Sequence, residues 1–412
     1  MPGKRRPIAQ RNPHGQQWAL VTAAGDVLDV VPTASDALVV AQANKLEAIV
    51  DRELDLGADI EQNPLGVRGP EVAHRGMGGL RVNARRAMAM SVEDAYRRLA
   101  PAFPQAKRGG AIKAWSSAKQ MRENLLSANY KLAKTETTPA QRRLLHMRYG
   151  KSGINVQGLT LLPNIVWNLV VYGQEWKRLP VEQRVNTCVG ASRECREACL
   201  VYSGRNEADP YNTVIKTAKL TALLREPDAF ARMLVAACDS HLGSERTADL
   251  RMVRLNVFSD IPWELVFPEL FEIVPGQFYD YTKVPSRQPP ANYDLTFSYS
   301  GRNLEDAGEE LRLGRRIAVV FLTKKHQLPA MFFDVPVVDG DISDARPLDP
   351  PRVVVGLSYK PPKKAGVTVN KKDNVFVVPV HELDGQLVAA LVPRDQPDTE
   401  DPQNDGVLPR SA

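Results

Sequence analysis

The sequence has few cysteines, few aromatic residues and no long apolar run. Only four of the 412 residues are cysteines, and 7% are aromatic. No apolar segment reaches the roughly 20 residues of a transmembrane helix, and the basic start lacks the apolar stretch of a signal peptide. Four cysteines do not form a disulfide framework in so long a chain. We therefore expect a cytoplasmic protein with reduced thiols and no membrane partner.

Positive charge is present in excess and is unevenly distributed. The chain carries a net charge of +6, which favours a polyanionic partner. Residues 101–150 hold ten lysines and arginines against two acids, an excess larger than that of the whole chain. Helical patterns in this region place Lys131, Lys134, Arg142 and Arg143 on polar faces. The region is either solvated helix surface or an arm that contacts nucleic acid, because clustered basic side chains gain from counterion release.

Composition divides the chain into five segments. Residues 1–13 are predicted to be a disordered basic tail, and 394–412 a disordered acidic tail. Between them we expect a ββα accessory unit over 14–54, a basic linker and helical region over 55–150, and a β/α core with a cysteine loop over 151–393. In the linker, Ser91 followed by acidic residues predicts a helix over about 92–99.

Short apolar strands separated by helical or loop segments recur through the core. The predicted strands are 159–162, 252–258, 277–282, 294–299, 316–322, 335–339 and 353–358. Strands that are apolar on both faces and alternate with connectors are typical of a parallel sheet. The predicted fold class is therefore α/β, with a parallel β/α core that forms a partial or full barrel.

Polar residues follow these strands at their carboxyl ends. Such ends share one edge of a parallel sheet, where ligands bind. One polar residue after a strand is ordinary turn chemistry, but its repetition favours a site. Carboxylates and a lysine suit general-base and phosphate-neutralising roles, so the catalytic candidates are Asp260, Asp280, Lys283, Asp339 and Asp341. The candidates for substrate contact are Asn256, Ser259, Ser298, Arg302 and Lys324.

Three cysteines, Cys188, Cys195 and Cys199, fall within twelve positions. Clustered thiols at short spacing are a metal-ligand pattern, because thiolate is the best soft donor in a protein. Three thiolates bind three irons of a [4Fe–4S] cluster and leave the fourth iron open. Zinc would need a fourth ligand, for which Cys238 and His241 are the nearest candidates, although Cys238 follows an apolar run and suits a core position. Unligated redox-active thiols are the remaining interpretation.

The combination of motifs resembles a family of actinobacteriophage proteins over roughly residues 120–380. The motifs that carry it are the segment from Asn124 to Lys134, the cysteine loop, Ser203-Gly-Arg, and the segments 254–264, 278–283, 292–298 and 338–341. This resemblance implies a phage or prophage product acting in a bacterial cytoplasm, and it brings no activity with it.

More distantly, three cysteines after the first strand of a β/α scaffold are similar to radical S-adenosylmethionine enzymes. That family spaces its cysteines three and then two residues apart and has an aromatic residue beside the last. Here the intervals are six and three, and Leu200 follows Cys199. The resemblance therefore implies cluster ligation more than it implies S-adenosylmethionine binding.

Two functions of different classes remain. The first is an iron–sulfur or metal enzyme that acts on a nucleotide or nucleic acid, with Lys283 neutralising phosphate and Asp260 or Asp280 as general base. The second is a non-catalytic nucleic-acid-binding protein in which a structural zinc ion staples the cysteine loop.

Overall fold

The computed structural model describes residues 8–11, 18–21, 27–31, 74, 76–103, 115–127, 138–164, 166–180, 183–202, 210–243, 249–361, 374–383 and 386–389. Near the amino end, β1 (Ile8–Arg11), β2 (Trp18–Val21) and β3 (Val27–Val31) pair antiparallel. Strand β1 comes from the segment predicted to be disordered. The helix predicted to follow β3 lies outside the described residues.

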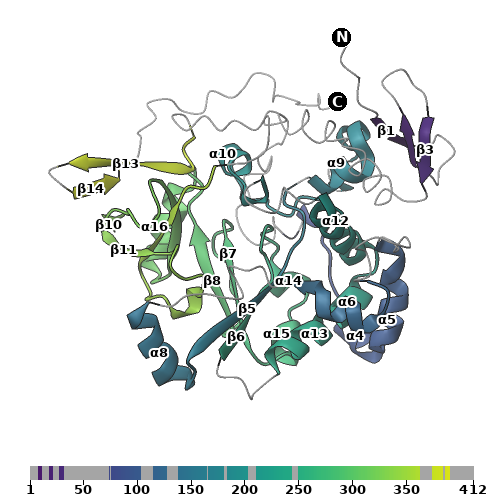
Figure 1. The fold of residues 1–412 in the computed structure, drawn as a ribbon, viewed down its shortest axis with the longest axis horizontal. Helices are drawn as coiled ribbons and strands as arrows, with labels where there is room; N and C mark the ends of the chain where they lie inside the picture. Colours follow the sequence, from purple (N-terminus) through teal and green to yellow (C-terminus); the bar gives the residue numbers. More distant parts are fainter. Residues whose placement is uncertain are drawn as a thin grey trace, which may run out of the picture.

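A mostly parallel sheet forms the centre of the molecule (Figure 1), with its strands in the order β10-β11-β12-β9-β8-β7-β6-β5-β4. The parallel strands are β5 (Gly153–Leu159), β6 (Asp249–Arg254), β7 (Gln277–Thr282), β8 (Tyr293–Ser298), β9 (Ile317–Leu322), β11 (Val335–Asp339) and β12 (Val354–Ser358). Every neighbouring pair from β5 to β11 in this order is parallel. The predicted α/β class with a parallel core sheet is confirmed.

The predicted strands from residue 277 onward agree with the observed ones to within one residue, but the prediction for the first strand is wrong. That strand runs over Gly153–Leu159 instead of 159–162. Buried and partly exposed residues alternate along β5, and its sequence Gly-Ile-Asn-Val-Gln-Gly-Leu has no apolar run. Leu161 and Leu162 are buried because they enter the hydrophobic core beside the helices.

The sheet divides at the carboxyl end of β9. Strand β8 pairs with β9 only through Phe297–Ile317 and Ser298–Ala318. Beyond that point β13 (Val377–Leu383) takes over this side of β9 and pairs in parallel with Val320–Leu322. Strand β13 then forms a hairpin with β14 (Gln386–Ala389). The carboxyl ends of β8 and β9 are therefore separated by a segment from late in the chain.

The edges and faces of the sheet are covered by short elements. At the edges, β4 (Leu126–Ser127) pairs antiparallel with β5, and β10 (Met331–Phe332) with β11. Helices of the main core are α4 (Ala84–Ala89), α5 (Val92–Leu99), α6 (Ala118–Leu125), α9 (Val166–Tyr172), α12 (Pro210–Arg225), α13 (Pro227–Leu242), α14 (Trp263–Val266) and α15 (Leu270–Ile273). Helix α16 (Leu304–Arg312) packs on β8 and β9. Short 3₁₀ turns are η1 (Ala100–Ala102), η2 (Gly173–Arg178), η4 (Leu200–Tyr202) and η5 (Arg346–Leu348).

Part of the predicted linker belongs to this core. Helix α5 begins after the Ser91 cap, as predicted, and α4, α5 and α6 pack against α13. Several of their apolar residues, including Leu99, Met121 and Leu125, are almost fully buried. The predicted region is thus partly helical core, because a few well-spaced apolar residues decide the packing although glycine and arginine dominate the local composition.

The opposite face of the sheet carries α8 (Pro139–Tyr149), whose Leu145 packs with residues of β5, β6 and β7 and with η5. Helix α8 precedes β5, so it lies at the amino end of the parallel strands (Figure 1). Among the helices that the structure describes, none is long and apolar enough to span a bilayer.

A buried lysine lies inside the helical layer. Lys219 on α12 is 1% exposed, and its Nζ donates to the Leu125 carbonyl at 2.7 Å. Burial, together with the charge of Lys216, lowers the pKa of Lys219 from 10.5 to about 7. Between about pH 7 and pH 10.5 the Lys219 side chain is mostly protonated in the unfolded chain and mostly neutral in the folded protein. The contribution of Lys219 to stability therefore rises with pH through this window and is lost as pH falls towards 7.

We predict that Lys219→Met removes this pH dependence. The free energy of unfolding of the wild type, relative to the variant, should rise between pH 6 and pH 10 by up to about 4 kcal/mol. Urea unfolding followed by tryptophan fluorescence at several pH values measures it. Lys119 has a side chain that is 76% exposed, so Lys119→Met is the control and should show no such trend. A difference that stays flat with pH would contradict the prediction.

Candidate functional site

The cysteine loop crosses the carboxyl ends of the parallel strands. Thr187 Oγ1 donates to the Leu162 carbonyl just beyond β5 at 2.7 Å, and its own carbonyl accepts from Asp260 N, beyond β6, at 2.7 Å. Ser192 Oγ donates to the Ser300 carbonyl, beyond β8, at 2.8 Å. The loop therefore lies at the edge where parallel sheets bind ligands.

Short polar contacts give the loop its local shape. Asn186 Oδ1 accepts from Cys188 N at 2.9 Å, and Ser192 caps α10 (Arg193–Glu197) by accepting from Cys195 N at 3.1 Å. Gly190 is needed for close packing, because a Cβ there would lie 2.8 Å from the Lys283 carbonyl oxygen. The backbone of the loop is thereby pressed against the segment after β7.

A partly buried ion pair anchors α10 to the split in the sheet. Glu194 is 6% exposed and accepts from Arg302 Nη2 at 2.7 Å. Burial raises the pKa of Glu194, but the hydrogen bonds and charge of Arg302 hold it below its ordinary value. Asn374, just before β13, donates to the Glu194 carbonyl at 3.2 Å. Arg302, predicted to contact substrate, is therefore engaged in holding the cysteine helix.

The three thiols are partly buried, and the pKa values of two of them are raised. Cys188 Sγ donates to the Phe258 carbonyl at 3.4 Å. Burial raises the pKa of Cys188 to about 12 and that of Cys199 to about 11, and negative charge on neighbouring cysteines adds to each shift. Cys195 packs against Phe376 and neighbouring apolar residues. Without a bound cation the Cys188 and Cys199 thiols stay protonated near neutral pH, so a ligand of the thiolates must displace protons.

Two lysines face these thiols. Lys283 Nζ donates to Ser298 Oγ at 3.0 Å. Burial lowers the pKa of Lys283, but negative charge on all three cysteines and on Asp260 more than compensates and raises it. Lys216, on α12, is 3% exposed, and its charge, like that of Lys283, lowers the pKa of Cys199 against the larger effect of burial. The site therefore combines three cysteine thiols with two lysines whose charges favour the thiolate form.

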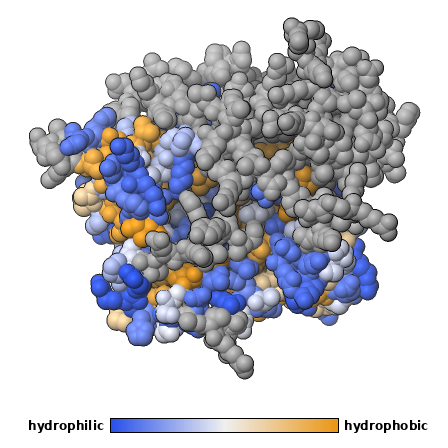
Figure 2. All heavy atoms as spheres, viewed as in Figure 1, coloured by the Kyte–Doolittle hydropathy of each residue, from blue (hydrophilic) through white to orange (hydrophobic). Residues whose placement is uncertain are grey.

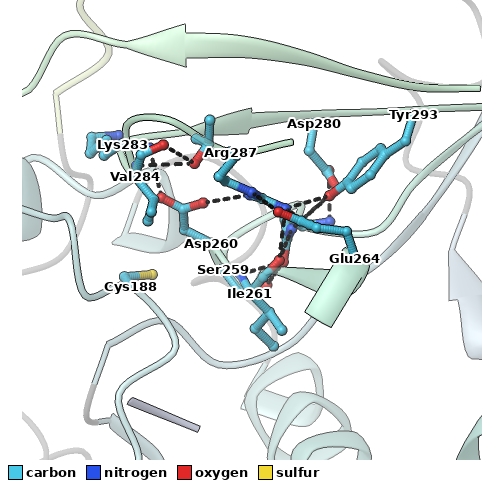
Figure 3. A network of polar contacts seen from close by, with 12 residues as sticks. Cys188, Ser259, Asp260, Ile261, Glu264, Asp280, Lys283, Val284, Arg287 and Tyr293 are labelled. Carbon is cyan, nitrogen blue, oxygen red and sulfur yellow. Dashed lines mark hydrogen bonds and ion pairs between the residues drawn. The ribbon is translucent and has the colours of Figure 1, made fainter. Parts of the chain in front are cut away.

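The buried guanidinium of Arg287 holds the loops after β6 and β7 together (Figure 3). It is 1% exposed and forms ion pairs with Asp260 at 3.2 Å (Nη1–Oδ1) and with Glu264 at 2.5 Å (Nη2–Oε2). The other Asp260 oxygen, Oδ2, accepts from Lys283 N at 2.7 Å. Burial raises the pKa of Asp260, and the charge of Arg287 opposes that rise. With both oxygens engaged, Asp260 positions Lys283 and the cysteine loop.

Asp280 belongs to a deeper part of the same network. Figure 3 shows it beside Tyr293, on the far side of Arg287 from Cys188. Its carboxylate accepts from Tyr293 Oη at 2.7 Å and from Asn256 N at 2.7 Å, and Ser259 Oγ donates to Asn256 Oδ1 at 2.8 Å. Burial raises the pKa of Asp280 to about 7. The site is thus supported by a buried hydrogen-bond network that includes Asn256, Ser259 and Asp280.

The acids after β11 form a separate group. Asp339 Oδ2 lies 2.6 Å from His326 Nδ1, and Asp341 Oδ1 lies 2.8 Å from Lys360 Nζ. Lys324 is exposed nearby, and its carbonyl accepts from Ser358 Oγ at 3.3 Å. These contacts tie the group to the segments that follow β9, β11 and β12, on the side of the sheet beyond β13.

The nucleic-acid candidates lie elsewhere. Arg142 and Arg143 are exposed on α8, at the end of the sheet opposite α10 (Figure 1). Lys131 and Lys134 lie outside the described residues. The sequence prediction thus combines residues from two ends of the molecule.

Residues that sequence reasoning missed include Lys216, Arg287, Glu194 and Asn374. The one available signal was Lys216, which lies with Lys219 among the apolar residues in the middle of α12. Cys238 and His241, the candidates for a fourth zinc ligand, lie on α13, where Cys238 is fully buried and His241 Nε2 is 3.1 Å from the Met252 carbonyl oxygen. Across the described ranges, no three Cys, His, Asp or Glu side chains are close enough to share one metal ion.

Comparison with known proteins gives one match. The family model described as gene product 88 matches residues 124–374, more than half of the chain. This range contains the cysteine loop, both lysines and the Arg287 network. Searches of curated proteins and of solved structures find no match.

We predict that Arg287→Met destabilises the protein by about 3–5 kcal/mol, because Asp260 and Glu264 would remain buried without a counter-charge. Urea unfolding measures the loss. Arg312→Met is the matched control, since Arg312 pairs with Glu309 at the surface and should contribute less than about 1 kcal/mol. Equal effects of the two substitutions would show that the buried network does not hold these loops.

Proposed function

The chain belongs to the gene product 88 family, and we propose that it is a phage-type enzyme whose cysteine loop holds an iron–sulfur cluster and acts on a nucleotide or nucleic acid. One observation carries the proposal. Three cysteines and two lysines converge at the carboxyl edge of a parallel sheet, where such folds place their ligands.

The number and type of the donors favour a [4Fe–4S] cluster over a single metal ion, because no three Cys, His, Asp or Glu side chains of the described residues are close enough to share one ion. Cys188, Cys195 and Cys199 would hold three irons, leaving the fourth for an external ligand. The cluster would supply electron transfer or a Lewis-acidic iron. Lys283 and Lys216 fit the anionic charge of cluster-bound thiolates, because each already lies within electrostatic range of Cys199. The similarity to radical S-adenosylmethionine enzymes rests on the cysteines alone, so that molecule is one candidate for the external ligand.

The two lysines support a substrate that carries phosphate. A phosphate group that reached Lys283 and Lys216 would exchange water for two charges in a partly buried site, where such contacts are strong. Ser298 holds the Lys283 ammonium, and Asp260 holds the Lys283 backbone. We therefore assign Lys283 to substrate contact and assign Asp260 and Asp280 to positioning. Asp339, Asp341 and Lys324 would act only on a substrate large enough to reach β11.

We predict that replacing Cys188, Cys195 or Cys199 by alanine removes most of the bound iron and sulfide, whereas Cys238→Ala does not. Cys238 is the matched control because it is a buried core thiol on α13. Anaerobic purification, metal and sulfide analysis, and visible absorbance measure the outcome. Equal metal content in all four variants would overturn the site. Stoichiometric zinc without sulfide would instead support the second function, a nucleic-acid-binding protein with a structural zinc ion.

We also predict that Lys283→Met leaves iron content unchanged but weakens binding of a nucleoside triphosphate roughly ten-fold or more, since a charge-assisted phosphate contact contributes about 1.5–3 kcal/mol. Isothermal titration calorimetry of the anaerobic protein gives the affinity. The control is Lys325→Met, an exposed lysine beyond β9. Unchanged affinity in the Lys283 variant would remove phosphate recognition from this site.

A further inference from the structure

A cavity of about 540 Å³ lies at the opposite end of the sheet from the cysteine loop. It is formed where β6, β7 and β8 begin, and the end of α8 forms one wall. Three of its lining residues, Arg148, Lys151 and Arg251, are cationic, against the single acid Asp249. Small-molecule sites have volumes of roughly 300–1,000 Å³. The cavity therefore suits an anionic group of about nucleotide size.

Helix α8 presents a basic face beside this cavity. It contains no acidic residue, and Arg142, Arg143 and Arg148 are exposed. Neither Arg142 nor Arg143 forms an ion pair with any residue that the structure describes. Figure 2 shows strongly hydrophilic surface at the lower left, where α8 lies. Exposed guanidinium groups without a carboxylate partner gain most from phosphate, because counterions are released without breaking an existing pair.

The helix is a fixed platform for these arginines. A capping box between Thr138 and Gln141 begins α8, and Gly150, with a φ of 61°, ends it. The side chain of Gln141 also donates to Asp349 Oδ1 at 2.7 Å, and Leu145 is fully buried against the sheet. Little ordering is therefore required when a ligand meets the exposed face.

An aromatic ring lies within this basic surface. Tyr149 lines the cavity, and the guanidinium carbon of Arg148 lies 5.3 Å from its ring centroid. Stacking of a base on an aromatic side chain gives sequence-tolerant affinity, but only an unpaired base offers a free face. The combination of a basic helix, a nucleotide-sized cavity and an aromatic wall fits a single strand better than a duplex.

We propose that the basic face of α8 and the adjoining cavity bind single-stranded nucleic acid, with the backbone across Arg142 and Arg143 and a base against Tyr149. The inference rests on the proposed function only in its choice of a nucleic acid as the partner. The seven residues of β5 separate this surface from the cysteine loop by roughly 20 Å, at about 3.3 Å per residue. Binding here therefore does not require the cluster.

Fluorescence anisotropy of a labelled single-stranded oligodeoxynucleotide, titrated at several salt concentrations, tests the proposal. For Arg142→Glu/Arg143→Glu the slope of log Kd against log salt should flatten by roughly 1.4, at about 0.7 for each phosphate that the protein no longer neutralises. Arg97→Glu/Arg98→Glu on α5 changes the net charge equally and should leave the slope unchanged. Circular dichroism melts verify that each variant is folded.

Substitutions of the aromatic residue test the stacking contact separately. Tyr149→Leu should weaken binding roughly ten-fold at every salt concentration without changing the slope, whereas Tyr149→Phe should retain wild-type affinity. Equal slopes for the α8 and α5 pairs would overturn the proposal. So would a duplex of the same sequence binding as tightly as the single strand. The Cys188→Ala variant should bind the oligonucleotide like the wild type. A failed cluster assignment would therefore leave this result intact. Loss of binding in that variant would show that the two sites are not independent.

Discussion

The organisation of the site depends on the buried guanidinium of Arg287. A cation withdrawn from water must be neutralised by the protein, and here Asp260 and Glu264 both turn inward to do so. Once Asp260 is fixed, its second oxygen fixes the backbone of Lys283, and its own amide fixes Thr187 beside Cys188. One buried charge thus determines where the cysteine loop meets the strand ends.

The two ends of the sheet differ in chemistry. Partly buried thiols and lysines lie at the carboxyl end, where low polarity strengthens the electrostatic interactions between charged groups. The amino end has exposed arginines on α8 and an open cavity, where charges act over a longer range but are screened by salt. Under the two proposals, a polyanion at the amino end would be held by many weak contacts, whereas a group at the carboxyl end would be held by few strong ones.

Much of the fold could be predicted from sequence because the strands of a parallel sheet leave a local signature of apolar runs. Strand β5 escaped that signature because its buried residues alternate with partly exposed ones. The cysteines follow the first parallel strand in the sequence, which agrees with the observed place of their loop at the carboxyl edge. The partners of the charged residues could not be predicted from the sequence. Arg287 meets acids 23 and 27 positions away, and Arg302 meets Glu194 across 108 positions, so no local pattern distinguishes a structural arginine from one that contacts substrate.

The strand β13 that enters the split beside β9 has a consequence for the order in which the protein matures. Asn374 reaches Glu194 across 180 positions, and Gly301, with a φ of 87°, leaves no room for a Cβ against Val375. At about 5–20 residues per second, a ribosome needs roughly 9 to 36 seconds to make that interval. Throughout this time the cysteine helix has been made, but the segment that secures it has not. If the thiols hold the proposed cluster, this interval is the time in which it would be inserted before Asn374 bonds to their helix.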